Sequence, residues 1–433
     1  MSARVVLGVG AGIAAYKACE LLRLLTESGH HVRVVPTPDA LRFVGEATWA
    51  ALSGQPVTTD AWTGVAEVPH VRLGQSADLV VVAPATADLM ARAAAGMAGD
   101  LLTATLLTAR CPVLYAPAMH TEMWEHPATQ ANVALLRRRG AIVLDPATGR
   151  LTGQDSGAGR LPEPAAIFAV AIRLLDRGPA APDLAGRRVV VSAGGTREEI
   201  DPVRFIGNWS TGTQGYALAR TAVARGAEVT VVAANVSLPD PAGVKVTRVV
   251  SARELREAVL AAAEGADAVV MAAAVADYRP ATRSPAKIKK DGQPPEPIAL
   301  TENPDILAGL GSARSAQACA APQGHDAERG GLASSSPPRQ VLVGFAAETD
   351  TSPDGARAKL ARKGCDLLVV NPVGAGLGFG TPDNEAVVYG SDGTVTPIPR
   401  GPKEALADVV WDLVVGRLPK RAVTDKLTAV QET

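Results

Sequence analysis

The stretch Arg4–Pro36, "RVVLGVGAGIAAYKACELLRLLTESGHHVRVVP", decides the fold of the first half of the chain. It reads as a strand, a glycine turn, a helix and a second strand. Strands that are joined by a crossover helix run parallel, and the connection is right-handed. The stretch therefore predicts an α/β domain built on a parallel sheet.

A second stretch with the same order begins at residue 187, "RRVVVSAGGTREEIDPVRFIGNWSTGTQGYALARTAVARGAEVTVVA", and has a long insertion before its helix. The segment between the two stretches, "DRGPAAPDLAGRR", is rich in Pro, Ala and Gly and is typical of a linker. We therefore predict two Rossmann-like, three-layer α/β domains with mostly parallel sheets. Their expected bounds are 1–177 and 187–421, with a linker at 178–186 and a tail at 422–433.

One segment interrupts the alternation of strands and helices in the second half. Residues 312–339, "SARSAQACAAPQGHDAERGGLASSSPPR", have no apolar periodicity. Such a segment buries too little apolar surface to offset its chain entropy, so we predict a disordered insertion. The stretch "KEALADVVWDLVVGRL" near the C-terminus predicts an amphipathic helix.

Composition and charge exclude several classes of partner. The 433 residues carry a formal net charge of −1, which gives no electrostatic reason to expect nucleic acid or an anionic membrane. The four cysteines are scattered without a CxxC pair, which argues against a zinc site or a disulfide framework and favours the cytoplasm. The first residues predict a strand and a turn rather than a signal peptide, and no run approaches the roughly 18 apolar residues of a membrane span.

Several expected strand ends in the first half carry groups suited to a ligand. The glycines of "GVGAGIAAYK" precede a helix whose free backbone N–H groups favour an anion, although tight packing of strand against helix explains the same glycines. Ligands of open α/β sheets bind at the carboxyl ends of strands. Small hydroxyl and backbone donors with apolar walls suit a planar monophosphate better than a dinucleotide. The groups in question are Gly10, Gly12, Thr37, Pro84, Ala85, Thr86, Met119 and His120.

The motifs "GIAAYK", "HVRLGQSADL", "APATAD" and "PAMHTEMWEHPATQAN" together resemble the flavin-dependent phosphopantothenoylcysteine decarboxylases, in the same order across residues 4–162. The resemblance implies FMN and the removal of the cysteine carboxylate from 4′-phospho-N-pantothenoylcysteine. It implies that His70 is the catalytic base or proton relay; the alternative is a buried structural histidine at a strand start. The residues it places at FMN are Gly10, Gly12, Ile13, Thr37, Pro84, Ala85, Thr86 and Met119.

Two positions depart from the pattern of that family. His120 stands where the family usually has an asparagine that holds the substrate carboxylate, and we expect the imidazole to replace it as a donor. The family flap contains a proton-donating cysteine, whereas "LTGQDSGAGRLPEP" has none, and Asp155 or Ser156 is the candidate replacement. An alternative follows: the flavoprotein half is impaired, serves as a scaffold, or stops at the enethiol.

In the second half, "SAGGTREEIDPVRFIGNWSTGTQG" combines a Gly-Gly turn, arginines, an amide and hydroxyls between strand and helix, a set that suits phosphate or carboxylate recognition. Further on, Lys359 and Lys363 are four residues apart on one expected helix face. We predict that they converge on one polyphosphate; a solvated basic surface is the alternative.

The motifs "DPVRFIGNWSTG" and "AAVADY" resemble the phosphopantothenate–cysteine ligases, and the order of the two halves resembles the fused bacterial enzyme. The resemblance implies that the carboxylate of 4′-phosphopantothenate attacks the α-phosphate of CTP and that cysteine displaces CMP from the acyl-cytidylate. It implies that Asn208 holds the acyl-cytidylate and that Arg204 shapes the same loop. It also implies that Lys287 stabilises charge at the α-phosphate and that Asp277 binds the nucleotide directly or through Mg²⁺. The remaining nucleotide contacts are Ala273, Ala274, Asn303, Pro304, Asp305, Ile306, Phe345, Lys359 and Lys363.

The expected partners are therefore small molecules, namely 4′-phosphopantothenate, L-cysteine and CTP. The resemblance also implies a homo-oligomer, because trimeric flavoprotein contacts and dimeric ligase contacts together close as a dodecamer. The remaining alternative is a regulatory protein that binds a nucleotide and catalyses no reaction. This alternative gives His70, Asn208 and Lys287 no role.

Overall fold

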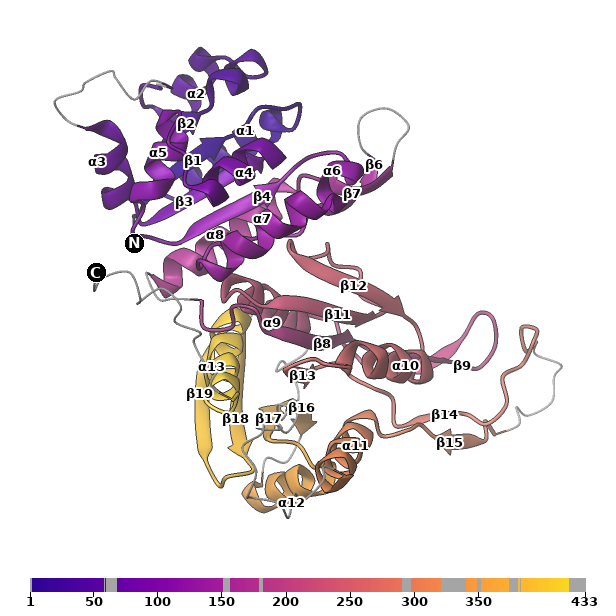
Figure 1. Cartoon of the computed structure of the whole chain (residues 1–433). Helices are drawn as coiled ribbons and strands as arrows, with labels where there is room; N and C mark the ends of the chain where they lie inside the picture. The colour runs from indigo at the N-terminus through magenta and orange to yellow at the C-terminus, as the bar shows by residue number, and fades with distance from the viewer. Residues whose placement is uncertain are drawn as a thin grey trace, which may run out of the picture.

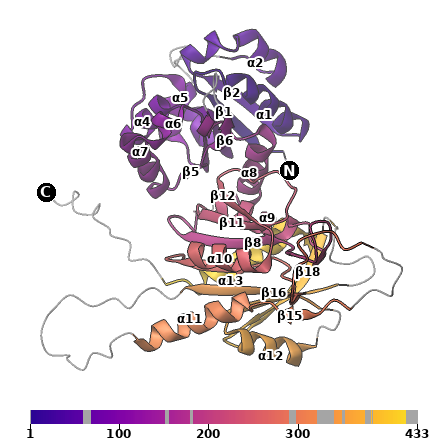
Figure 2. The ribbon, with the colours of Figure 1, turned by 90° about the vertical axis from the view of Figure 1, so that its right-hand side faces the viewer.

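The computed structural model describes residues 2–57, 59, 68–150, 156–178, 182–289, 297–320, 340–348, 352–373, 381 and 383–419. Figure 1 and Figure 2 show two lobes, one for each half of the chain, which meet where α8 lies beside α9. Among the described helices, none has both the length and the apolar character that crossing a bilayer requires.

The first half contains a five-stranded parallel sheet in the order β2-β1-β3-β4-β5. Its strands are β1 (Arg4–Val9), β2 (His31–Pro36), β3 (Leu79–Ala85), β4 (Val113–Pro117) and β5 (Ile142–Val143). An antiparallel hairpin, β6 (Ala147–Arg150) and β7 (Ser156–Arg160), follows the sheet. The helices are α1 (Ala15–Glu27), η1 (Pro38–Arg42), α2 (Glu46–Ser53), α3 (Pro69–Ser76), α4 (Ala87–Ala95), α5 (Leu101–Thr108), α6 (Thr121–Glu125), α7 (Pro127–Arg138) and α8 (Pro164–Arg177).

The strands of this sheet are nearly all apolar because helices cover both faces. Alternate residues point to opposite sides: Val5 and Leu7 pack with α1, α2 and α8, while Val6 packs with α4, α5 and α7. The three-layer arrangement confirms the fold that was expected from the sequence.

The second half contains an eight-stranded sheet in the order β12-β11-β8-β13-β16-β17-β18-β19, in which β18 and β19 are antiparallel to their neighbours. Its strands are β8 (Arg188–Gly194), β11 (Glu228–Ala234), β12 (Val244–Val249), β13 (Ala268–Met271), β16 (Val341–Glu348), β17 (Leu367–Pro372), β18 (Asp383–Gly390) and β19 (Val395–Pro402). Two small pairs accompany it, β9 (Arg197–Glu199) with β10 (Phe205–Gly207), and β14 (Tyr278–Pro280) with β15 (Leu300–Glu302). The helices are α9 (Thr213–Ala224), α10 (Ala252–Ala263), α11 (Ile306–Ala320), α12 (Pro353–Lys363) and α13 (Lys403–Val415).

Helices cover both faces of this sheet as well. α9 and α13 pack on one face, and α10, α11 and α12 pack on the other. The helix expected near the C-terminus is α13, and its buried face includes Trp411, whose indole N–H donates to the backbone oxygen of Leu218 on α9.

The two halves share one apolar core. The cluster that contains Leu174 of α8 also contains Tyr216 of α9 and Trp411 of α13. The described end of the predicted linker belongs to this core, because Leu184 is 0% exposed. Leu184 therefore anchors the described part of the linker in the shared core.

The predicted disordered insertion is wrong in its first part. α11 continues through it as far as Ala320, and Arg314 of that helix forms an ion pair with Asp366 and donates to the backbone oxygen of Gly364. These tertiary bonds hold a segment whose composition alone predicts no order. Residues 321–339 lie outside the described part of the chain.

Candidate functional site

A cavity of about 700 Å³ opens at the carboxyl ends of β1, β3 and β4. Five of the eight residues that the resemblance assigns to FMN line it, together with His120, which was assigned to the substrate carboxylate; the five are Gly12, Ile13, Pro84, Thr86 and Met119. The other lining residues are Ala11, Ala14, Tyr16, Lys17, Ala87, Asp88, Ala118, Met123, Arg150, Gly159, Arg160 and Leu161. The glycine loop, the start of α4 and the β6–β7 hairpin thus enclose one space.

Gly10 supports this cavity from behind and is not among its lining residues. Its backbone N–H donates to the carbonyl oxygen of Pro84 at 3.0 Å. A Cβ at Gly10 would lie 2.5 Å from the same oxygen, so only glycine allows the β1 loop to approach the β3 loop this closely. The peptide bond between Ala83 and Pro84 is cis.

The two predicted threonines cap helices. Thr86 accepts from the backbone N–H of Leu89 at 3.2 Å and begins α4 at the cavity wall. Thr37 accepts from the N–H of Ala40 at 3.3 Å and begins η1. Thr37 and Ala85 are not among the lining residues, and Ala85 is fully buried, so the structure does not place these two at the cavity.

His120 lies where the sequence predicted a ligand-facing polar group. β4 ends at Pro117, and His120 then occupies the N-cap position of α6 with its side chain exposed at the cavity. The neighbouring Met119 donates its N–H to the oxygen of Gly159 at 2.9 Å, which fixes the hairpin to this loop. Asp155 at the hairpin tip lies outside the described residues.

His70 lies on α3, one residue after the helix begins, and not at a strand start as the alternative reading supposed. Its backbone oxygen accepts from the hydroxyl of Thr108 at 2.7 Å, which ties α3 to α5. Its side-chain Nδ1 is buried and has no hydrogen-bond partner among the described residues. A buried polar nitrogen without a partner is rare and costly in a structural role.

Three cations at the cavity, Lys17, Arg150 and Arg160, received no role from the sequence. Lys17 follows the glycine loop directly, so its nearness to a ligand could have been inferred from "GIAAYK". Arg160 lies within "LTGQDSGAGRLPEP", the segment that the resemblance identifies as the flap, so its nearness could also have been inferred. Arg150 precedes that segment, and the motifs gave no signal for it.

In the second half, the predicted groups gather around the carboxyl ends of β8 and β13. The amide Nδ2 of Asn208 donates to the backbone oxygen of Val275 at 2.9 Å. A Cβ at Gly195 would lie 2.6 Å from the oxygen of Asn208, so the Gly-Gly turn permits this approach. Ala273 and Ala274 are held to the end of β8 by bonds from their N–H groups to Ser192 Oγ and Gly194 O.

Arg204 and the Lys287 segment are also adjacent. The guanidinium of Arg204 pairs with Asp201, and its Nε lies 3.0 Å from Oδ2 of that carboxylate. The pairing holds the pKa of the Asp201 carboxyl well below its usual range. The guanidinium also donates to the backbone oxygen of Ile288 at 3.0 Å, while the N–H of Ile288 donates to Asp201 at 3.2 Å. Lys287 itself is exposed beside this network.

The two lysines of α12 pair with carboxylates on different elements, and their convergence on one polyphosphate stays a prediction. Lys359 pairs with Glu348 at the end of β16 at 2.7 Å, and Lys363 pairs with Asp305 before α11. Each ammonium is oriented by a carboxylate on a different element, so a polyphosphate bound by both lysines would have to replace two separate ion pairs.

Two of the predicted nucleotide contacts, Ile306 and Phe345, lie on opposite faces of the sheet. Ile306 is buried in the core on the α11 face, whereas Phe345 packs against the core on the opposite face. Asn303, in contrast, is tied to the predicted loop, because its Nδ2 donates to Ala276 O at 2.9 Å and its N–H donates to Asp277 O at 2.8 Å. Pro304 follows it in the sequence.

Asp277 is exposed beside these groups. Among the described residues, no group of three His, Cys, Asp or Glu side chains is placed to hold a metal ion. Mg²⁺ accepts one carboxylate together with phosphate oxygens and water, so a single Asp277 is compatible with a metal that arrives with a nucleotide.

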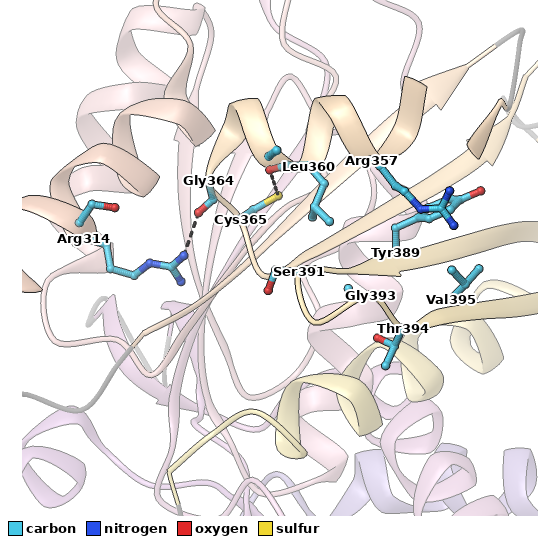
Figure 3. A pocket seen from close by; sticks show the side chains of 13 residues that line it. Arg314, Arg357, Leu360, Gly364, Cys365, Tyr389, Ser391, Gly393, Thr394 and Val395 are labelled. Atoms are coloured by element: carbon cyan, nitrogen blue, oxygen red, sulfur yellow. Dashed lines mark hydrogen bonds between the residues drawn. The ribbon is translucent and has the colours of Figure 1, made fainter. Parts of the chain in front are cut away.

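A separate cavity of about 490 Å³ lies at the amino end of β17, between α12 and the β18–β19 turn (Figure 3). Its lining includes Arg314, Arg357, Cys365, Tyr389 and Ser391, and burial raises the pKa of the Cys365 thiol to about 11. None of the residues singled out from the sequence lines it. It lies at the opposite end of the parallel strands from the predicted site.

The two halves match two family models. Residues 1–176 match the model described as Flavoprotein. Residues 184–324 and 330–418 match the model described as DNA/pantothenate metabolism flavoprotein C-terminal domain.

Full-length relatives are similar over almost the whole chain. The coenzyme A biosynthesis bifunctional protein CoaBC of Mycobacterium tuberculosis is 59% identical over 95% of this chain and 96% of its own length. The protein of the same description from Mycolicibacterium smegmatis is 57% identical over 96% and 98%, and that from Vibrio vulnificus is 42% identical over 90% and 92%.

Solved structures align with one half at a time. The C-terminal domain of a CoaBC protein aligns at 32% identity over 55% of this chain and 97% of that structure, with a TM-score of 0.42. A mutant PPC decarboxylase complexed with pantothenoylaminoethenethiol aligns at 30% identity over 41% and 100%, with a TM-score of 0.38. At these TM-scores the alignments add nothing to the topology described above.

Proposed function

The chain belongs to the family of bifunctional coenzyme A biosynthesis proteins, enzymes with a flavoprotein decarboxylase half and a ligase half, and from this premise we propose its substrates and the roles of its residues. The ligase half condenses 4′-phosphopantothenate with L-cysteine at the expense of CTP. The decarboxylase half converts the product, 4′-phospho-N-pantothenoylcysteine, to 4′-phosphopantetheine. The observation that carries the proposal is the convergence on one cavity of five predicted FMN residues and of His120, the residue predicted to hold the substrate carboxylate.

The residues around the first cavity fit FMN. Ile13, Tyr16 and Met123 offer apolar side chains to a flat ring, and the nearby cations suit its phosphate. When bound, FMN supplies the electron acceptor for the substrate thiol, which makes loss of the neighbouring carboxylate possible. His120 holds that carboxylate, and His70 moves the proton of the thiol.

The Nδ1 of His70, which has no hydrogen-bond partner within the described part of the chain, supports a site that a second copy of the chain completes. His70 is not among the lining residues of the cavity on its own chain, so its imidazole serves a neighbouring subunit. We place this reaction in a homo-oligomer in the cytoplasm, with a dodecamer as the expected assembly.

In the second half, the proposal assigns the carboxylate of 4′-phosphopantothenate to attack the α-phosphate of CTP. Lys287 stabilises the charge that develops at that phosphate, and Asp277 binds the Mg²⁺ that accompanies the triphosphate. Asn208 holds the acyl-cytidylate until the amine of cysteine displaces CMP. Its present bond to Val275 fixes the amide at the end of β13, where the acyl group would lie.

The runner-up function keeps the ligase and makes the flavoprotein half incomplete. The sequence feature that favours it is the absence of a cysteine from "LTGQDSGAGRLPEP". In that case Asp155 does not deliver the proton that completes the reaction, and the flavoprotein half releases an enethiol.

Turnover of 4′-phosphopantothenate, CTP and cysteine by the full-length chain, with product masses measured, distinguishes these outcomes. Phosphopantetheine supports the proposal. Accumulation of the enethiol supports the runner-up, and accumulation of phosphopantothenoylcysteine means that the first half does not turn over. A reaction with ATP in place of CTP is the control for the nucleotide. Absence of any condensation product in the reaction with CTP contradicts the ligase assignment.

A further inference from the structure

The rim of the first cavity carries a cluster of charges whose members have no individual role in the proposed reaction. Lys17 Nζ lies 3.2 Å from both carboxylate oxygens of Glu163, and the guanidinium of Arg160 pairs with the same carboxylate. Lys17 and Arg160 both line the cavity, whereas Glu163 does not. One solvent-exposed carboxylate thus pairs with two cations that line the cavity.

These three residues come from three different elements. Lys17 belongs to the first turn of α1, Arg160 ends β7, and Glu163 is the N-cap residue of α8. A side chain at an N-cap usually accepts from the first turn of its own helix, yet Glu163 makes no such bond. Its carboxylate is engaged by the two cations instead, so it connects the glycine loop to the base of the hairpin.

The cluster is charged at neutral pH. Partial burial works against the charged form of Glu163, but the bonds from Lys17 and Arg160 outweigh it and lower the pKa of the carboxyl below its ordinary value. Lys17 is well covered, since only 17% of its side chain is exposed. A covered ammonium retains more of its field than an exposed one.

Cations outnumber acidic groups among the described residues that line the cavity. They include Lys17, Arg150 and Arg160, against Asp88 as the one acidic residue of this described lining, and Asp88 pairs with Arg92 at 2.9 Å. The start of α1 adds the partial positive charge of a helix N-terminus. Two convergent cations and a helix start together match a doubly charged anion better than a single carboxylate.

We propose that Lys17 and Arg160 form a phosphate-binding pair in the first cavity, and that Glu163 is the positioning residue that holds the pair together. The ligand group is a phosphate monoester. It comes either from the cofactor or from the phosphorylated substrate, and the inference rests on the proposed flavin-dependent function of this half.

The first arm of the test compares FMN with riboflavin, which lacks the phosphate. Full-length chain freed of flavin is titrated with each, and quenching of flavin fluorescence gives the two dissociation constants. If the pair binds the cofactor phosphate, Lys17→Gln and Arg160→Gln each lower the preference for FMN about tenfold, while Arg160→Lys retains part of it.

The second arm compares phosphorylated with dephosphorylated pantothenoylcysteine as substrates for CO₂ release. If the pair binds the substrate phosphate, the same variants raise KM for the phosphorylated substrate about tenfold and leave kcat and the FMN preference unchanged. Glu163→Gln shifts the same ratio as the cation variants by a smaller factor, because both cations remain but lose their common partner.

Arg23→Gln is the matched control, since Arg23 pairs with Glu27 at 3.1 Å on the exposed face of the same helix. It leaves both ratios at the wild-type value. Unchanged ratios in Lys17→Gln and Arg160→Gln overturn the phosphate-binding pair even if flavin binding and CO₂ release are normal. A wild-type chain that binds neither flavin overturns the proposed function itself, together with this inference.

Discussion

The loops at the strand ends of the first half enclose a cavity, whereas the corresponding loops of the second half bond to one another. Around the first sheet, six predicted residues face the same space and three cations stand at its wall. Around the second sheet, Asn208 bonds to Val275, Arg204 pairs with Asp201, and Lys359 pairs with Glu348.

This difference matches the proposed occupants. A cofactor that stays bound through many turnovers requires a formed cavity, and preorganised walls reduce the cost of binding it. Substrates that enter and leave in each cycle exchange protein bonds for ligand bonds, so paired side chains keep the empty site stable. We therefore expect the first site to be sensitive to shape and the second to be sensitive to charge.

The largest expected effect is the loss of CO₂ release in His70→Asn. The substitution removes a proton-transfer group, which costs up to about 10⁴-fold in rate. Flavin absorbance should stay at the wild-type level, because His70 does not line the cavity of its own chain. Normal CO₂ release in this variant would make His70 structural.

The next largest effect is expected in the ligase half. Lys287→Gln should slow CTP-dependent pyrophosphate release by about 10² to 10³-fold, because one group that stabilises transition-state charge is lost. Asn208→Asp should instead accumulate the acyl-cytidylate, which mass spectrometry detects. Retained flavin and CO₂ release serve as the control in both variants; if those activities fall too, the two halves are not independent.

A smaller effect tests the importance of shape in the first half. Gly159→Ala places a Cβ 2.2 Å from the backbone oxygen of Met119, at a φ of +151°, and this strain costs about 1–3 kcal/mol. The hairpin should then separate from the β4 loop, and FMN affinity should fall roughly tenfold. Gly45→Ala is the control, since no atom lies within 4 Å of a Cβ there. Equal affinity in both variants would contradict the role of the hairpin.

The smallest effects are expected at α12. Lys359→Gln and Lys363→Gln should each raise KM for CTP about threefold, because each removes a cation from the phosphates. The effect is small because each ammonium must first leave its carboxylate partner. The double variant should show the product of the two effects, as independent sites do. A double variant no worse than either single variant would instead favour the common target that the sequence predicted.

The strands and the glycine loops could be predicted because they depend on local patterns. Runs such as "RVVLGV" and "LVVVAPA" are strands wherever both faces are covered. The antiparallel β18–β19 hairpin was not predicted. The course of α11 was missed because its Ala- and Ser-rich composition says little about a helix that Arg314 anchors to Asp366.

At the site, sequence reasoning found the residues on motifs and missed the pairs between distant segments. Lys17 and Glu163 are 146 positions apart, so no spacing rule connects them. Lys359 was expected at a phosphate and is held by Glu348, a partner that only the fold provides. Local patterns predicted where ligands bind, but the charge balance there depends on tertiary contacts.

The interface between the two halves, called the seam here, also contains ion pairs with little exposure to solvent. Arg225 of the second half is 0% exposed and pairs with Asp183 and Asp412, while Arg173 of α8 pairs with Asp408 across the seam. Fragments made by cutting the chain between 178 and 182 therefore carry complementary parts of one core and one ionic cluster. Co-expressed as separate polypeptides, they should associate and assemble into an active oligomer, held together by this interface and not by the peptide link.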